Sequence, residues 1–309
     1  MEQKALFIVN PRAGKMKFRN DLFESISMLG AAGYTTSVHA TQERGDAMRL
    51  AAELGGGVDL VVCCGGDGTL NEVINGMMAL ETPPLLGYLP AGTTNDFATG
   101  LHLPHGIIPA TEIALSGQAS KIDIGLFNQR YFSYIASFGA FTEASYSASQ
   151  SAKNLLGHVA YLLEGAKDIA NIRSTHIRIE TPRMSLEDDF IFGAVSNATS
   201  IAGLLKLSAD QVRFNDGVFE VILIRAPQNL LEVQRVVSSM LKKKFNDELI
   251  TFFHTDEITF QTVNEMQWSL DGEQAEGPRR TVITNCHNRL KIMLPQQTAM
   301  QLEQSKIES

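Results

Sequence analysis

Residues 59–72 read DLVVCCGGDGTLNE, and this stretch decides how the first half of the chain folds. The apolar run predicts a buried strand, the glycines predict a tight turn, and the residues after Gly68 are competent to form a helix. Glycines at such a turn let the backbone approach a ligand closely. The N–H groups and the dipole of the helix start then favour phosphate. The stretch is therefore a candidate nucleotide-binding loop.

Asp67 adds a second indication, because a carboxylate beside phosphate is unfavourable unless a cation lies between them. Its position in this loop points to Mg²⁺. The alternative is a plain turn in which Asp67 and Asn71 serve as helix caps. A lone glycine-rich turn is more often structural, but Gly-Gly-Asp-Gly-Thr directly after a strand favours nucleotide binding.

Short apolar runs alternate with amphipathic helical patterns on both sides of this stretch. This alternation predicts a parallel sheet with helices on both faces, which binds ligands at the carboxyl ends of its strands. The expected strands are residues 5–9, 35–40, 59–64 and 84–90, and the expected helices are residues 18–29, 46–54 and one that begins after Gly68.

Two further polar loops follow predicted strands of the same sheet. NPRAGK (10–15) comes after the first strand, and PAGTTNDF (90–97) comes after PLLGYLP. Each could be ordinary turn chemistry, but three glycine-containing loops at one sheet edge would line one crevice. The pattern is neither a P-loop, which needs Gly-Lys-Ser/Thr, nor the G-x-G-x-x-G dinucleotide fingerprint.

After Asp123 the pattern changes to many short strands without alternating helices. This predicts a mainly antiparallel second domain, either a sandwich or an open barrel. Two acidic turns stand out in it, Ser269-Leu270-Asp271-Gly272-Glu273 and Asp216-Gly217, and each could also be an exposed turn. Trp268 could pack against substrate or in the core of this domain, and we expect the core.

Composition narrows the class of protein. The chain has 309 residues with 26 basic and 34 acidic side chains, a net charge of −8, which argues against a general nucleic-acid binder. No apolar run reaches the roughly 18 residues that cross a bilayer. The N-terminus lacks signal-peptide anatomy, and three cysteines without metal spacing fit a reducing compartment. A soluble, cytoplasmic protein is expected.

The motifs NPRAGK, GGDGTLNEV, PAGTTNDFA, NDGVFEV and LDGE, in this order, resemble the diacylglycerol kinase-like lipid kinases. That family includes sphingosine and ceramide kinases, and the chain is most similar to its soluble bacterial diacylglycerol kinases. GGDGT alone is shared with NAD kinases and, in variant form, with phosphofructokinases. The resemblance implies an N-terminal three-layer α/β domain that binds ATP, a C-terminal antiparallel β-sandwich, and an active site in the interdomain cleft. The expected domains are residues 1–125, with 290–309 packing back on them, and residues 126–289.

The resemblance also implies a set of site residues. Asp271 would be the general base for a lipid hydroxyl and Glu273 a magnesium-linked carboxylate, although these two roles could be exchanged or shared. Asp67 and Asp96 would take part in a Mg²⁺ network. The implied ATP contacts are Asn10, Pro11, Arg12, Ala13, Gly14, Thr41, Gly66, Asp67, Gly68, Thr69, Leu70, Asn71, Glu72 and Thr94. Asp216, with the carbonyls of Arg213 and Val218, would hold a structural Mg²⁺, and Phe219 departs from relatives that place an acidic residue there.

Two expectations concern partners. Residues 152–170 have apolar side chains at helical spacing with Lys153 and Lys167 outside the stripe, so this helix either packs on the sandwich or meets anionic lipid headgroups, aided by Lys15 and Arg19. We expect transient peripheral contact with the inner membrane face. An edge strand of the second domain could pair two copies into a homodimer.

The expected reaction is ATP- and Mg²⁺-dependent phosphorylation of a membrane lipid, with diacylglycerol converted to phosphatidic acid. Another acceptor is an alternative: a sphingoid base, polyprenol, phosphatidylglycerol, monoacylglycerol or NAD. A non-catalytic nucleotide-binding regulator is a further one. The presence of Asp67, Asp96, Asp271 and Glu273 favours an enzyme.

Overall fold

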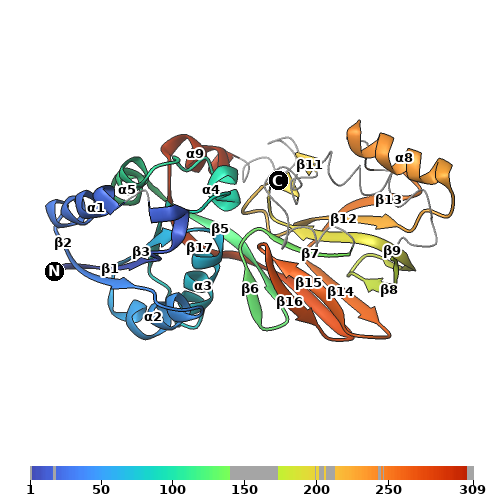
Figure 1. Cartoon of the computed structure of the whole chain (residues 1–309), viewed down its shortest axis with the longest axis horizontal. Coiled ribbons are helices and arrows are strands. Elements are labelled where there is room, and N and C mark those ends of the chain that lie inside the picture. The colour runs from blue at the N-terminus through green and yellow to red at the C-terminus, as the bar shows by residue number, and fades with distance from the viewer. Residues whose placement is uncertain are drawn as a thin grey trace. The chain divides into compact units, whose positions relative to one another are not determined.

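The computed structural model of the chain describes residues 2–16, 19–139, 173–198, 200–201, 205–206, 213–242, 245 and 247–304. The residues group into two units (Figure 1). The first comprises Met1–Ile124, Phe214–Asp216 and His287–Ser309, and the second comprises Gly125–Arg213 and Gly217–Cys286. The expected helix at 152–170 and the side chains of Lys15 and Arg19 lie outside the described residues.

The first unit contains a parallel sheet with the strand order β2-β1-β3-β4-β17. The central strands β1 and β3 are the apolar runs of the sequence, and their residues from Ala5 and from Leu60 onward are buried. The strands are β1 (Gln3–Val9), β2 (Tyr34–Ala40), β3 (Leu60–Gly65), β4 (Leu85–Pro90) and β17 (Arg280–Leu294), whose last residues reach this sheet.

Helices cover both faces of this sheet (Figure 1). On one face α1 (Arg19–Ala31) and α5 (Ile107–Ser116) pack on alternate residues of β1 and β3. On the other face lie α2 (Asp46–Leu54) and α3 (Asp67–Met78). The expected α/β architecture is confirmed. The shorter helices are η1 (Ala13–Met16), η2 (Gly55–Gly57), α4 (Asp96–Gly100) and α9 (Gln296–Gln304).

The second unit is built on antiparallel pairs, as expected for the strand-rich half of the chain. Trp268 is fully buried and meets Phe127, Phe138 and Phe260 edge-on at 5.0–5.1 Å between ring centroids, so its core position is confirmed. Its elements are β5 (Gln118–Phe127), which begins in the first unit, β6 (Arg130–Phe132), β7 (Ile135–Gly139), β8 (Thr175–Glu180), β9 (Ser185–Ser196), β10 (Ser200–Ile201), β11 (Leu205–Lys206), β12 (Phe219–Arg225), α8 (Leu230–Leu241), β13 (Ile250–Thr255), β14 (Glu257–Thr262), β15 (Met266–Leu270) and β16 (Glu273–Gly277). No helix in the described ranges is long and apolar enough to span a bilayer.

Candidate active site

The three glycine-containing loops of the first unit lie at one edge of its sheet. The carboxyl ends of β1, β3 and β4 are in register, since the Asn10 N–H donates to the Cys64 carbonyl at 2.9 Å and the Ala91 N–H donates to the Gly65 carbonyl at 2.8 Å. Strand β2, which follows β1 in the chain, lies on one side of β1, and β3 lies on its other side. The strand order therefore reverses at β1, and the loops flank a topological switch point. This is the position at which open α/β sheets bind ligands.

Glycines let these loops approach one another backbone to backbone. A Cβ on Gly92 would lie 2.6 Å from the Cα of Gly66, and a Cβ on Gly14, whose φ is +54°, would lie 2.2 Å from the Ala91 carbonyl oxygen. Side chains at these positions would push the loops apart, because real Cβ contacts are not that short. The glycine pattern of the sequence therefore brings the loops together as well as exposing N–H groups.

Asp67 joins the β3 and β4 loops. Its carboxylate accepts hydrogen bonds from the Asp96 N–H at 3.1 Å and from the Phe97 N–H at 3.4 Å. Asp67 and the exposed Asp96 are thus neighbouring acidic residues at the sheet edge. Below them, burial and then the charge of Asp67 raise the pKa of Tyr88 well above its usual value, and Asp96 contributes to this shift.

Oxygen ligands of this kind suit Mg²⁺, which proteins hold through one or two carboxylates together with water and substrate phosphates. The described part of the chain contains no group of three or more His, Cys, Asp or Glu residues that would by itself hold a metal. A Mg²⁺ ion that also binds water and substrate phosphate needs no third protein carboxylate. Asp67 and Asp96 therefore fit a nucleotide-linked Mg²⁺.

The other expected ATP contacts are placed unevenly. Asn10 donates through Nδ2 to the Thr69 hydroxyl at 2.9 Å, and the Thr41 N–H donates to the Val9 carbonyl at 2.9 Å, so both belong to the same edge. Arg12 and Thr94 are exposed. The side chains of Thr69, Leu70 and Asn71 are buried, and the Leu70 N–H donates to the Gly66 carbonyl at 3.0 Å at the start of α3. Contact of these three residues with ATP stays a prediction.

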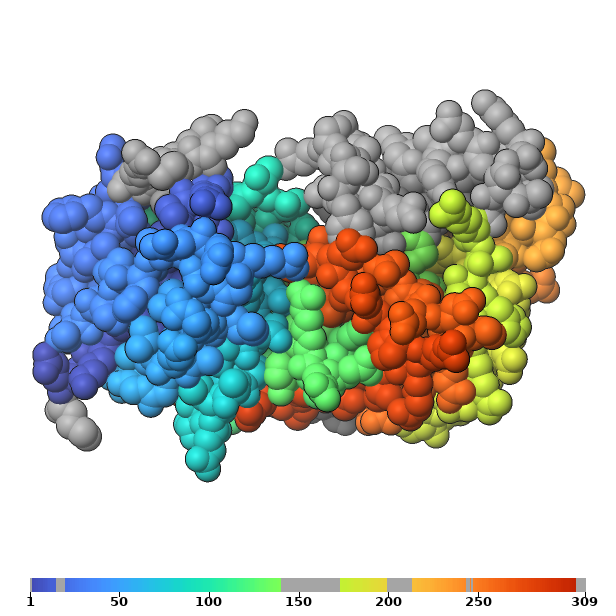
Figure 2. Space-filling model, turned by 60° about the horizontal axis from the view of Figure 1, so that its bottom comes forward, coloured from blue at the N-terminus to red at the C-terminus, as the bar shows by residue number. Residues whose placement is uncertain are grey.

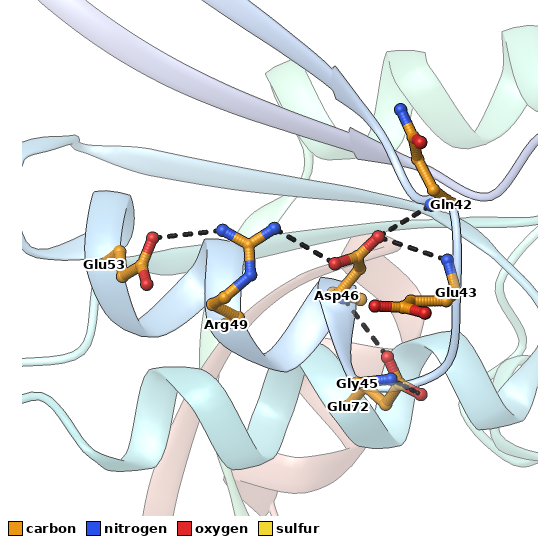
Figure 3. A network of polar contacts seen from close by, with 8 residues as sticks. Gln42, Glu43, Gly45, Asp46, Arg49, Glu53 and Glu72 are labelled. Carbon is orange, nitrogen blue, oxygen red and sulfur yellow. Dashed lines mark hydrogen bonds and ion pairs between the residues drawn. The ribbon is translucent and has the colours of Figure 1, made fainter.

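The carboxylate of Glu72 caps helix α2 (Figure 3). Oε1 accepts from the Gly45 N–H at 2.9 Å and Oε2 accepts from the Ala47 N–H at 3.2 Å. These are N–H groups at the start of α2, where a negative charge is favourable. Glu72 follows the glycine turn on α3, so this contact joins the loop after Thr41 to the helix that begins at Asp67. Contact between Glu72 and ATP, implied by the family resemblance, stays a prediction.

The same loop is braced by Asp46 (Figure 3). Its Oδ2 accepts from the backbone N–H groups of Gln42 at 2.8 Å and Glu43 at 3.2 Å, and its Oδ1 pairs with Arg49 at 3.0 Å. Arg49 also pairs with the exposed Glu53 at 3.2 Å. The hydrogen bond from the Gln42 N–H lowers the pKa of Asp46 most, and the hydrogen bond from Arg49 has the next largest effect in the same direction. The loop therefore has a local hydrogen-bonded shape in addition to the contact with Glu72.

Replacing Glu72 tests its capping role. We expect Glu72→Ala to lower the free energy of unfolding by about 1–2 kcal/mol, because two helix N–H groups lose their acceptor. Glu72→Gln should lose less, since it keeps one acceptor oxygen. Urea unfolding measures both. Glu53→Ala, which removes an exposed ion pair of the same network, is the control and should not change the transition midpoint. If Glu72→Ala unfolds like the control but raises KM for ATP, Glu72 is a ligand contact instead.

In the second unit, Asp271 is a buried carboxylate with four donors. Oδ2 accepts from the Ser133 N–H at 2.6 Å and the Ser133 hydroxyl at 2.8 Å, while Oδ1 accepts from the N–H groups of Tyr134 at 3.0 Å and Ile135 at 3.1 Å. Burial raises the pKa of Asp271, and the bonds from Ser133, Tyr134 and Ile135 act in the opposite direction. Its backbone has a φ of +51°. The carboxylate therefore holds the β6–β7 connection in place.

Glu273 is more accessible than Asp271. It begins β16, its side chain is 27% exposed, and its Oε2 pairs with Nη2 of Arg130 on β6 at 3.2 Å. Asp271 and Glu273 lie close together because they are two positions apart in sequence, and sequence reasoning missed Arg130 and Ser133. Their link to the LDGE turn arises from pairing across the sheet, for which the sequence carries no local signal.

Asp123 is a buried carboxylate that sequence reasoning also missed. It is fully buried in the first unit, where Oδ1 accepts from the Asn288 N–H at 2.6 Å and lies 3.0 Å from Nδ1 of His287. A charged residue amid the apolar pattern of β5 was the available signal.

Asp216 is exposed at a point where the chain passes between the units, and the structural Mg²⁺ expected there with Arg213 and Val218 stays a prediction.

The chain matches the family model of the diacylglycerol kinase catalytic domain over residues 4–127. It is 34% identical to the diacylglycerol kinase of Bacillus subtilis (strain 168) across 97% of this chain and 99% of that protein. It is 32% identical to the diacylglycerol kinase of Staphylococcus aureus (strain MRSA252) across 88% of this chain and 87% of that protein.

Solved structures show the same similarity to diacylglycerol kinases. A candidate diacylglycerol kinase from Bacillus anthracis superposes with a TM-score of 0.77 at 27% identity, covering 94% of this chain and 95% of that one. An NAD kinase from Archaeoglobus fulgidus, solved in complex with ATP, superposes with a TM-score of 0.53 at 9% identity over 99% of this chain and 100% of that one, which shows a shared fold. With similarity to curated relatives along almost its whole length, this chain belongs to the diacylglycerol kinase family and is a kinase.

Proposed function

We propose that this protein transfers the γ-phosphoryl group of ATP, with Mg²⁺, to the hydroxyl of diacylglycerol and so forms phosphatidic acid. Membership of the family supports a lipid kinase, and the site supports the finer statement. The observation that carries it is the Asp67 carboxylate, which joins two glycine loops and lies beside Asp96 at the sheet edge. Phosphoryl transfer requires mainly positioning and neutralisation of charge, and this edge offers both.

Each loop has a role in this proposal. The backbone N–H groups of Gly14 and of residues 66–69 would donate hydrogen bonds to phosphate oxygens, with residues 10–13, Thr41 and Thr94 as further ATP contacts. Asp67 and Asp96 would hold Mg²⁺, which when bound neutralises charge on the phosphates. Glu72 would support ATP binding indirectly, through its bonds to Gly45 and Ala47.

On the acceptor side, Glu273 is the better general base. Both oxygens of Asp271 already accept two hydrogen bonds each, so Asp271 would have to release one of them to take a proton. Glu273 is partly exposed. In the proposed step the lipid hydroxyl oxygen bonds to the γ-phosphorus, the bond to the β–γ bridging oxygen breaks, and ADP leaves. The hydroxyl proton passes to Glu273 and then to solvent.

The test is an acceptor screen with labelled ATP. The protein is incubated, with and without Mg²⁺, with vesicles that contain diacylglycerol, a sphingoid base, polyprenol or phosphatidylglycerol, with NAD, and without acceptor. Labelled phosphatidic acid should form in the diacylglycerol arm and only with Mg²⁺. The NAD arm tests the function that the shared fold with an NAD kinase brings forward. Formation of labelled NADP, or hydrolysis of ATP alone, would contradict the proposal.

A further inference from the structure

One ion pair connects two hairpins of the second unit. Nη2 of Arg130, at the start of β6, lies 3.2 Å from Oε2 of Glu273, at the start of β16, and the two side chains are 34% and 27% exposed. Figures 1 and 2 show the green β5–β6 hairpin beside the orange-red β15–β16 hairpin. The partners are 143 positions apart in sequence, so the contact is a product of the fold.

Both partners are attached to the same buried frame. Asp271, two positions before Glu273, accepts hydrogen bonds from Ser133, Tyr134 and Ile135, and Ser133 lies three positions after Arg130. Strand β15 also pairs with β7, with Leu270 opposite Ala136. The backbones that carry the two charges are therefore held at fixed separation. This lowers the entropy that an ion pair between long side chains normally loses.

An ordinary surface ion pair in the same unit provides a contrast. Arg178 pairs with Glu180 at 2.8 Å, but both residues lie on β8 and are 53% and 38% exposed. Such pairs bring together neighbours on one strand and contribute little. The Arg130–Glu273 pair instead links two hairpins, and one partner is the carboxylate proposed as the base.

We infer that Arg130 is a positioning residue that orients the Glu273 carboxylate toward the acceptor hydroxyl. A guanidinium suits this role because it donates in a fixed planar geometry and does not lose its proton, so it cannot compete for the transferred one. Arg130 acts through Glu273 and need not touch either reactant. The inference rests on the proposed function, since it assigns a support to the base of that reaction.

The test compares Arg130→Met, Arg130→Lys and Arg130→Ala with a matched control, Arg178→Met, all in the whole chain. We expect Arg130→Met to lower kcat by about 10- to 100-fold, which is part of the 10²–10⁴-fold that a positioned base contributes, with KM for ATP unchanged. Arg130→Lys should recover part of the rate because it restores a cation. Free guanidinium at sub-denaturing concentration should partly restore Arg130→Ala. Arg178→Met should match the wild type.

A double-mutant cycle completes the test. If Arg130 acts through Glu273, Arg130→Met should cost no further rate in a Glu273→Gln background. Full additivity of the two losses overturns the inference, and so does an Arg130→Met variant as active as Arg178→Met. A defect that neither lysine nor guanidinium relieves also overturns it, because that is the behaviour of a purely structural residue. A wild type that phosphorylates no lipid refutes the proposed function instead, and the inference with it.

Discussion

Glu273→Gln should leave the protein folded and able to bind ATP while its lipid kinase turnover falls by about 10²- to 10⁴-fold, the usual contribution of a positioned general base. The amide has the size of the carboxylate but cannot accept the hydroxyl proton. Because Glu273 is partly exposed and pairs with Arg130, the substitution removes that ion pair and leaves no core cavity. Initial rates with diacylglycerol vesicles, ATP binding by calorimetry and urea unfolding measure the three quantities.

Asp271→Asn is the informative comparison for this prediction. One oxygen that now accepts two hydrogen bonds would become an NH₂ group facing N–H or O–H donors. Leaving buried donors without an acceptor costs about 1–3 kcal/mol. We expect this variant to lose turnover together with stability, whereas Glu273→Gln loses turnover alone. The opposite result, full stability and no turnover in Asp271→Asn beside an active Glu273→Gln, would return the base to Asp271.

The first unit was largely predictable because its information is local. An apolar run followed by Gly65-Gly66-Asp67 predicts a strand, a turn and a helix start within a few residues. Helix α3 begins at Asp67, slightly before the start that was expected after Gly68. Parallel strands then place their carboxyl ends at one edge, so the three loops could be expected to meet. The many short strands without intervening helices also predicted the antiparallel second unit.

The contacts within the site were less predictable because they depend on pairing between distant segments. Glu72 belongs to a motif that suggests a ligand contact, but its carboxylate bonds to Gly45 and Ala47 across the α2–α3 interface. Asp271 has its donors in residues 133–135, and Glu273 has Arg130. Strand register creates these neighbours, and a single sequence does not encode register over such separations.

The loops that follow β3 and β4 approach each other closely at Gly66 and Gly92, so a substitution at Gly92 should have a large effect. Gly92→Ala should weaken ATP binding by at least about tenfold and lower the free energy of unfolding by about 1–3 kcal/mol, because overpacking displaces backbone. The new Cβ would lie 2.6 Å from the Cα of Gly66 and 2.6 Å from Oδ1 of Asn95. That Oδ1 accepts the Gly92 N–H at 2.9 Å, so the substitution also disturbs the turn that leads to Asp96.

Calorimetric titration with an ATP analogue and urea unfolding measure the two effects. Gly57→Ala is the matched control in the same unit, because a Cβ there meets nothing within 4 Å, and it should bind the analogue like the wild type. If Gly92→Ala loses stability but keeps its affinity, the contact between Gly66 and Gly92 supports the fold alone. Phosphate binding would then have to depend on the other loops, since separating these two would leave it unchanged.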